Sequence, residues 1–141
     1  MLLYVAIGFG AAIENSGLSQ AVVEAGLGLV GSHGPLAGLL MVYLLTALLT
    51  ELMGHNPSVV LMTGIAISVA HTLHADPRAF VVAVAFAAAT SFATPVGYPT
   101  NTMVYYAGGY RFTDFMKIGI PLIALFCALS MFLIPHFWPL R

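Results

Sequence analysis

Charged residues are the scarcest feature of this sequence. Only four Lys/Arg and five Asp/Glu occur in 141 residues, so the charged fraction is 6%, against about a quarter in a typical soluble domain. The formal net charge of −1 provides no basic patch, so we expect no nucleic-acid partner. Hydrophobic residues make up 60% of the chain, and the mean hydropathy is +0.99. These values exclude an ordinary soluble domain and predict a protein that faces lipid.

Cysteine and catalytic motifs are also nearly absent. The single cysteine, Cys127, lies in an apolar run and excludes both an intrachain disulfide and a cysteine-based metal cluster. The histidines are scattered along the chain, and no HExxH spacing occurs. Local sequence shows no nucleophile with a nearby base, no phosphate-binding glycine loop and no paired carboxylates. We therefore expect a protein that is not an enzyme and has no resident cofactor.

Long apolar runs predict an all-α membrane protein. Leu36–Met53 and Ile118–Pro135 are the strongest, and the second ends in aromatic residues that suit a membrane interface. Val59–Leu73 is shorter, and Phe80–Ala93 is rich in alanine, which allows close packing against neighbouring helices. Residues 108–117 are predicted to form a polar connection. The chain is thus expected to be helical from end to end.

The first 30 residues are expected to begin inside a helix. Met1–Ile13 would be only about 20 Å long as a helix, whereas a span needs about 20 residues. No basic region or cleavage site typical of a signal peptide is present. We therefore expect an N-terminal truncation. Leu18–Val30 carries Gln20, Glu24 and two glycines, and we interpret it as a short interfacial segment.

Two polar interruptions, at Gly54–Ser58 and Thr94–Thr102, divide the apolar runs. Helix-breaking residues flanked by hydroxyls and amides are costly in hydrocarbon unless they line a protein-walled cavity, where secondary transporters bind substrate and ions. The first interruption joins either two spanning helices or the arms of a re-entrant hairpin, and length does not separate these arrangements. The second contains two prolines between short segments, which favours a functional unwound stretch.

The residue types at both interruptions suit ions. Asn56 is predicted to cap the second arm, with Pro57 in its first turn, so that free N–H groups face the interruption. The same pattern recurs where Thr100, Asn101 and Thr102 precede a helical segment. Free carbonyls at the ends of the preceding helices suit a hard monovalent cation. The pattern therefore predicts an anion bound beside Na⁺.

Two titratable residues adjoin the first interruption. Glu51 is the only acid within a strongly apolar helix, so it is either a functional carboxylate or an acid that reaches water from a helix end. His55 either binds a proton or an anion or is a solvated residue of a turn. The Gly54-His55-Asn56-Pro57 sequence on its own also fits a simple turn. The sequence leaves these alternatives open.

Four stretches have distinctive sequences: Ile7–Leu18, Thr50–Met53, Phe92–Tyr105 and Gly108–Phe112. Together they resemble the divalent anion/sodium symporters, which carry sulfate or di- and tricarboxylates. The resemblance covers nearly the whole chain and is to the C-terminal half of such a transporter. It implies one transmembrane transport domain over residues 1–141, built as one inverted-repeat half, with the first repeat absent.

The resemblance also implies a fold and a set of ligands. Leu36–Leu73 would form a re-entrant helical hairpin, and the Ala93-Thr94-Pro95 turn would lie in a broken transmembrane helix. Asn56, Ala93 and nearby backbone oxygens would bind Na⁺, while Asn56 and Thr94 would face the anion.

Further candidates for the same cavity are Thr100, Asn101 and Thr102. The tip departs from the Ser-Asn-Thr-like sequence usual in the family, because Gly54 lacks a hydroxyl and His55 replaces an amide. The departure leaves the coupling ion, Na⁺ or H⁺, open.

The expected function is therefore part of a sodium-coupled symporter of sulfate or a dicarboxylate. The alternative is a non-transporting membrane scaffold or a remnant of such a transporter. The expected partners are a small inorganic or organic anion, the lipid bilayer, a complementary N-terminal half and a homo-oligomer. The expected location is the cell membrane, as a multi-pass protein of a bacterial inner membrane.

Overall fold

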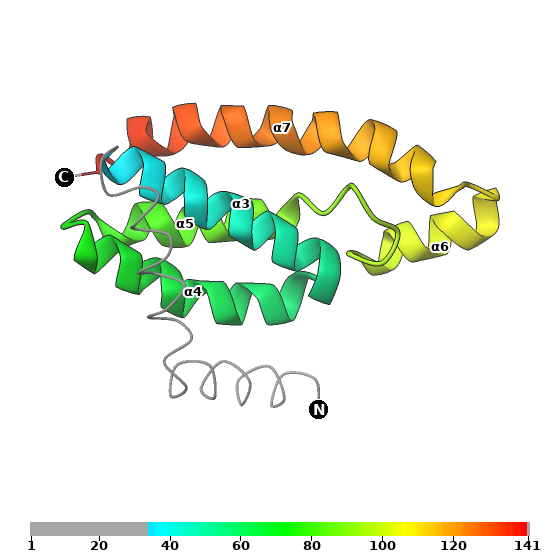
Figure 1. Ribbon diagram of the computed structural model, residues 1–141, viewed down its shortest axis with the longest axis horizontal. Coiled ribbons are helices and arrows are strands. Elements are labelled where there is room, and N and C mark those ends of the chain that lie inside the picture. Colours follow the sequence, from blue (N-terminus) through cyan, green and yellow to red (C-terminus); the bar gives the residue numbers. More distant parts are fainter. Residues whose placement is uncertain (1–33, 141) are drawn as a thin grey trace.

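The structure is a computed structural model that describes residues 34–140. The segments predicted at Met1–Ile13 and Leu18–Val30 lie outside this range. Within it the chain is helical and contains no strand, which confirms the all-α class. The helices are α3 (Pro35–Met53), α4 (His55–Thr72), α5 (Pro77–Ala89), α6 (Pro99–Gly108) and α7 (Phe112–Phe137), as Figure 1 shows.

α3 and α4 form a hairpin whose turn is a single residue, Gly54. Its backbone has φ 84° and ψ 172°, a conformation open essentially only to glycine. Gly54 caps both the end of α3 and the start of α4. The prediction that Asn56 caps the second arm was wrong, because the turn is made by the Gly54 backbone and Asn56 already lies in the first turn of α4. The hairpin tip is therefore tighter than the sequence indicates.

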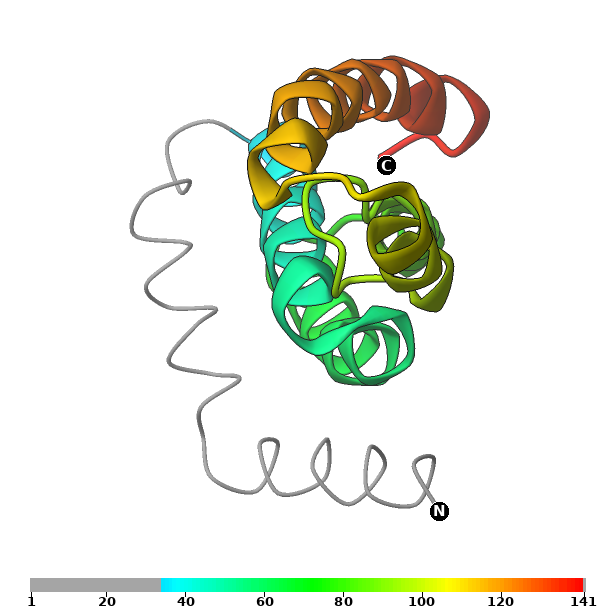
Figure 2. The same ribbon diagram turned by 90° about the vertical axis from the view of Figure 1, so that its right-hand side faces the viewer.

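α5 packs against both arms of the hairpin through small residues. Ala79, Ala83 and Ala87 recur every four residues on one face and are fully buried. Such a face lets helix backbones approach closely, so the predicted close packing of the alanine-rich run is confirmed. Tyr43 of α3 and Phe80 of α5 are the largest buried side chains in this core. Figure 2 shows the helices end-on, with α7 covering one side.

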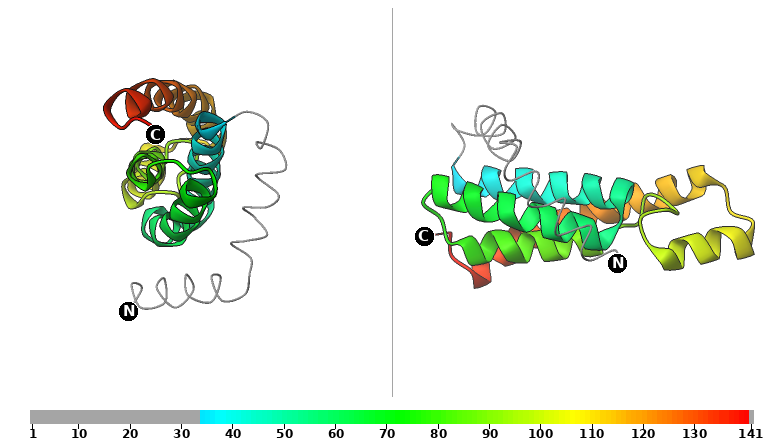
Figure 3. Two further views of the ribbon diagram at one scale, coloured as in Figure 1. Left: turned by 90° about the vertical axis from the view of Figure 1, so that its left-hand side faces the viewer. Right: turned by 90° about the horizontal axis from the view of Figure 1, so that it is seen from below.

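α7 runs along α3 and α5 and extends beyond the hairpin tip (Figures 1 and 3). It begins earlier than predicted, because Asp114 accepts a hydrogen bond from the Arg111 N–H at 3.0 Å and fixes the first turn. The prediction of a polar connection over residues 108–117 was thus wrong from Phe112 onward.

Gly119 marks where α7 meets the segment between α5 and α6. A Cβ at this position would collide with the backbone of Phe92 and Ala93, so the two backbones are in direct contact. The part of α7 before Gly119, residues 112–118, is about 10 Å long as a helix. The hairpin tip contacts the same segment further along, with Gly54 near the Gly97 carbonyl, and α7 extends beyond the tip (Figure 1).

Among the helices of residues 34–140, α3 and α7 are long and apolar enough to cross a bilayer. The outer face of α3 carries exposed leucines at every fourth position. These are Leu36, Leu40, Leu44, Leu48 and Leu52. α6 contains no buried residue within the described part of the chain. These apolar surfaces suit lipid or further membrane helices.

We predict that Gly119→Ala separates α7 from the segment at Phe92, because the added methyl group has no space. The free energy of unfolding should fall by about 1–3 kcal/mol, as for other overpacked sites. Thermal unfolding of the purified protein in detergent measures the change. Gly64→Ala is the matched control, since no heavy atom lies within 4 Å of its Cβ position. Equal stability of the two variants would contradict the prediction.

Candidate functional site

The segment between α5 and α6, residues 90–98, is a non-helical break. α5 ends at Ala89 and α6 begins at Pro99, so the break starts and ends four residues earlier than the predicted Thr94–Thr102. Thr100, Asn101 and Thr102 consequently lie in the first turn of α6 instead of the unwound stretch. α5 and α6, the helices on either side of the break, follow one another along the long axis of the molecule (Figure 3). The segment is thus a helix interrupted at the level of the hairpin tip.

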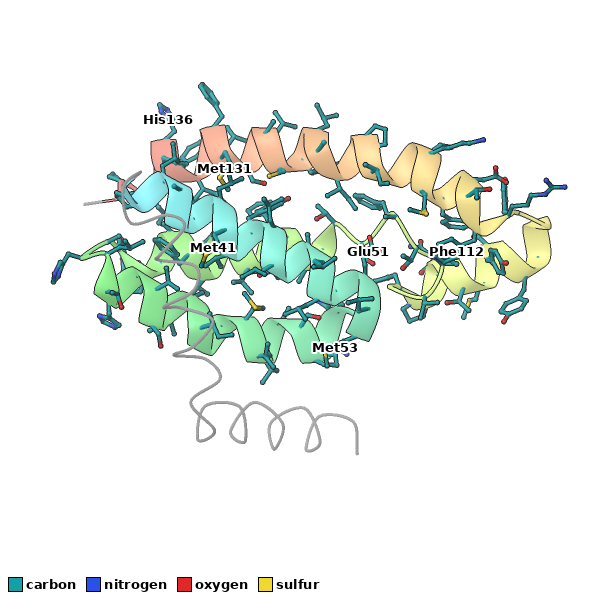
Figure 4. All side chains as sticks on the ribbon, viewed as in Figure 1. Met41, Glu51, Met53, Phe112, Met131 and His136 are labelled. Atoms are coloured by element: carbon teal, nitrogen blue, oxygen red, sulfur yellow. The ribbon has the colours of Figure 1, made fainter. Side chains whose placement is uncertain are left out.

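Glu51, near the end of α3, binds the break from the hairpin side (Figure 4). One carboxylate oxygen, Oε1, accepts the Ala93 N–H at 2.8 Å. The other, Oε2, accepts the Thr94 N–H at 2.8 Å and the Thr94 hydroxyl at 2.6 Å. The side chain is 9% exposed. Of the two interpretations of Glu51, a carboxylate reaching out to water does not match this geometry.

His55, the first residue of α4, binds the chain just before the break. Its Nδ1 lies 2.9 Å from the Ala88 carbonyl oxygen, in the last turn of α5. A carbonyl only accepts hydrogen bonds, so Nδ1 is the donor, and Nε2 of the neutral ring is then an acceptor. The imidazole also packs edge-on against Tyr98, with ring centroids 6.3 Å apart. The hairpin tip therefore contacts the end of α5 and the last residue of the break.

Side chains of the break and of α6 satisfy the non-helical backbone. The Asn101 side-chain N–H₂ donates to the carbonyls of Ser91 at 2.8 Å and Thr94 at 3.2 Å. The Thr102 hydroxyl donates to the Pro95 carbonyl at 2.6 Å. Thr94 Oγ1, besides donating to Glu51, accepts the Gly97 N–H at 3.1 Å. Backbone groups freed from a helix inside a membrane need partners of this kind.

An open cavity of about 720 Å³ lies between the hairpin tip and α6. Its wall consists of Met53, Gly54, His55, Asn56, Pro57, Val96, Gly97, Tyr98, Pro99, Thr102, Met103 and Tyr106. Among the described residues, no lysine, arginine or carboxylate lines it. The N-terminal turns of α4 and α6 both reach the cavity, and neither has a side-chain cap. Helix N-termini carry partial positive charge, so the cavity is suited to an anion without a basic side chain.

The structure thus brings some of the predicted site residues together and separates others. Gly54, His55, Asn56 and Thr102 lie in the cavity wall. The remaining candidates lie elsewhere: Glu51, Ala93 and Thr94 form the contact behind the tip, Asn101 lines a second cavity beside α7, and Thr100 is exposed outside both.

Two residues at this site were not predicted, Ser91 and Gly97. A Cβ on Gly97 would collide with Ser91 Oγ and lie 3.1 Å from Glu51 Oε2. Ser91 is buried, and its hydroxyl has no partner within residues 34–140. A glycine between Pro95 and Pro99 was the available signal, since glycine often marks close backbone approach.

A helical hairpin with an apolar outer face and a broken helix that meet at a cavity with helix N-termini in its wall are features of membrane transporters. The sequence family described as citrate transporter matches residues 1–85. The chain belongs to this family of divalent anion transporters, which confirms the resemblance drawn from its motifs.

Three relatives illustrate the similarity. An uncharacterized transporter of Synechocystis is 50% identical over 84% of this chain and 19% of its own length. An uncharacterized transporter of Escherichia coli is 33% identical over 93% of this chain and 22% of its own length. Sodium/sulfate cotransporter 1 of Chlamydomonas reinhardtii is 35% identical over 82% of this chain and 13% of its own length. The chain therefore spans about a fifth or less of these relatives.

We predict that Gly54→Ala lowers both stability and transport, because alanine is strained at φ 84° and the tip must shift. The expected cost is about 1–3 kcal/mol in the free energy of unfolding. Gly34→Ala is the matched control, since Gly34 has nearly the same backbone conformation, φ 80° and ψ −177°, at the start of α3. It should lower stability similarly and leave transport by the folded protein unchanged. Equal loss of transport in both variants would contradict a special role for the tip.

Proposed function

We propose that the chain supplies one half of the substrate site of a secondary active transporter, which carries a divalent anion together with Na⁺. Sulfate and dicarboxylates are the proposed substrates. The observation that carries the proposal is the cavity at the hairpin tip, where two uncapped helix N-termini meet hydroxyl and amide groups. Its family membership and the relatives named sodium/sulfate cotransporters also support it.

One side chain in the cavity wall, the Asn56 amide, can donate a hydrogen bond to the anion. The Thr102 hydroxyl donates to the Pro95 carbonyl and the His55 ring to the Ala88 carbonyl, so these two residues fix the wall. The backbone N–H groups in the first turns of α4 and α6 supply the other donors. Neutral donors and helix dipoles can hold a divalent anion without a permanent ion pair, which allows release on the other side of the membrane. Thr94 and Asn101 contribute by holding the break in place.

The C-terminal end of α3 suits the cation. Met53 and Gly54 reach the cavity wall, which brings the partially negative end of α3 close to the anion. In the proposed sodium site, the Asn56 side-chain oxygen and the Ala93 carbonyl complete a set of oxygen ligands. Binding the two ions side by side reduces the charge that must cross the membrane.

The position of the tip along α7 supports a re-entrant hairpin. α7 has 26 residues, which is about 39 Å of helix, whereas the hydrocarbon core is about 30 Å thick. With α7 across the bilayer, a tip that stops short of its start (Figure 1) would lie within the membrane. The cavity would then open within the bilayer, where a complementary half closes it. We propose that this half, in a homo-oligomeric multi-pass protein of the cell membrane, completes the transporter.

The proposal is tested by sodium-dependent uptake of radiolabelled sulfate and succinate into proteoliposomes. The chain alone is compared with the chain co-expressed with a complementary N-terminal half. Uptake is expected only in the combined sample and only with a sodium gradient. Uptake independent of Na⁺ would contradict sodium coupling. A lack of uptake in both samples, with correct insertion confirmed, would contradict transport and favour the scaffold alternative.

We predict that Asn56→Ala reduces the affinity for the anion, because it removes the side-chain amide from the cavity wall. A lost buried hydrogen bond costs on the order of 1–3 kcal/mol, or roughly 5- to 150-fold in affinity. Thr72→Ala is the matched control, since its hydroxyl bonds to the Ser68 carbonyl at the far end of α4. Concentration dependence of uptake measures the effect. Wild-type affinity in Asn56→Ala would refute the assignment.

A further inference from the structure

We propose that Glu51 is a positioning residue whose carboxylate permanently occupies an anion-binding turn at residues 93–94. The transported anion then binds at the tip cavity without the Ala93 and Thr94 N–H groups. The inference concerns the regulation of the same site and rests on the proposed function.

The donors around Glu51 are those that a bound oxyanion would need. Two successive backbone N–H groups and one hydroxyl point at a single carboxylate, at 2.8, 2.8 and 2.6 Å. Successive N–H groups in a turn form concave anion sites in many proteins, and hydrogen bonds to an ionised group are among the strong ones. In this chain the anion is supplied by its own α3. The turn is therefore already occupied before any substrate arrives.

The break leaves no space for a second anion at this turn. Gly97 packs so closely that even a methyl group would collide with Ser91 Oγ and approach Glu51 Oε2 to 3.1 Å. Ser91 is 3% exposed and Glu51 is 9% exposed, so the contact is closed to solvent. By contrast, the cavity on the tip side is open. Substrate and Glu51 thus have separate binding places.

The same contact fixes the break relative to the hairpin. Glu51 binds Ala93 and Thr94 in the middle of the break, and His55 binds the Ala88 carbonyl before it. Removing the carboxylate leaves the two N–H groups without a partner in a buried place, which is costly, while the Thr94 hydroxyl retains only the Glu51 backbone carbonyl at 3.2 Å. The break would then lose its fixed position, and with it the cavity wall formed by Val96–Pro99. Glu51 acts on the substrate site through the break and need not touch the substrate.

The test is chemical rescue of Glu51→Ala by formate. The variant creates a small void lined by the three donors, and formate is a carboxylate small enough to fill it. Melting temperature is measured in the assembled transporter purified in detergent, with sodium chloride of equal ionic strength as the control salt. We expect Glu51→Ala to melt at least about 5 °C lower than the wild type and formate to restore part of the loss. Formate should leave the wild type unchanged.

Glu51→Gln separates hydrogen-bond geometry from side-chain size. The amide has one oxygen, so its N–H₂ group must face a donor, and the variant has no void for formate. We expect a lowered melting temperature that formate does not restore. Sodium-dependent uptake of sulfate and succinate by Glu51→Ala should fall at least tenfold and recover in part with formate.

The outcomes separate this inference from the proposed function. Restored stability together with absent uptake in the wild type would support the role of Glu51 and refute transport of the anions tested. A transporting wild type combined with a Glu51→Ala variant that formate does not stabilise would overturn the inference alone. Tighter anion affinity in Glu51→Ala, at unchanged stability, would also overturn it, because the substrate would then be using the Ala93 and Thr94 donors.

Discussion

The carboxylate of Glu51 joins two parts of the chain that are 42 residues apart and holds together the two elements that build the cavity. A non-helical segment within a membrane is tolerated only when its freed backbone groups find partners. Glu51 supplies partners for two of these groups, and Thr94, Asn101 and Thr102 supply others. The shape of the tip cavity follows from this contact, because the cavity wall is the outer surface of the same segment. A buried charge is retained here because every oxygen of the carboxylate is hydrogen-bonded.

The helical class and the position of the first interruption could be predicted from the sequence, because both depend on local composition. A chain in lipid requires long apolar helices. Gly54 follows directly after one such apolar run, and glycine readily adopts the backbone conformation that ends a helix. The cap was assigned to Asn56 because side-chain caps are the commoner solution. The backbone of Gly54 makes the turn instead. The second break was predicted four residues too late, because the local sequence does not indicate that α5 ends at Ala89.

The candidate site was predictable as a region and not as a set of contacts. Polar residues at both interruptions indicated where ions bind, and the structure places Asn56 and Thr102 in one cavity. Glu51 was identified as an unusual acid, but its partners lie in a segment far along the chain. Gly97 and Ser91 were not predicted as site residues, because their role is steric. Their close packing against each other and against Glu51 of α3 exists only in the folded chain. Tertiary pairing therefore determined what local sequence left open.

The single-residue turn at Gly54 restricts how this region can change in evolution. One inserted residue would rotate α4 by about 100° about its axis relative to α3. The buried face of α4, which includes Met62, Ile65 and Val69, would then turn away from the core. Insertions and deletions are thus excluded at a place where most loops accept them. Diversification of the tip is left to exchanges of side chains such as His55 and Asn56, so homologous tips should differ in chemistry at constant length.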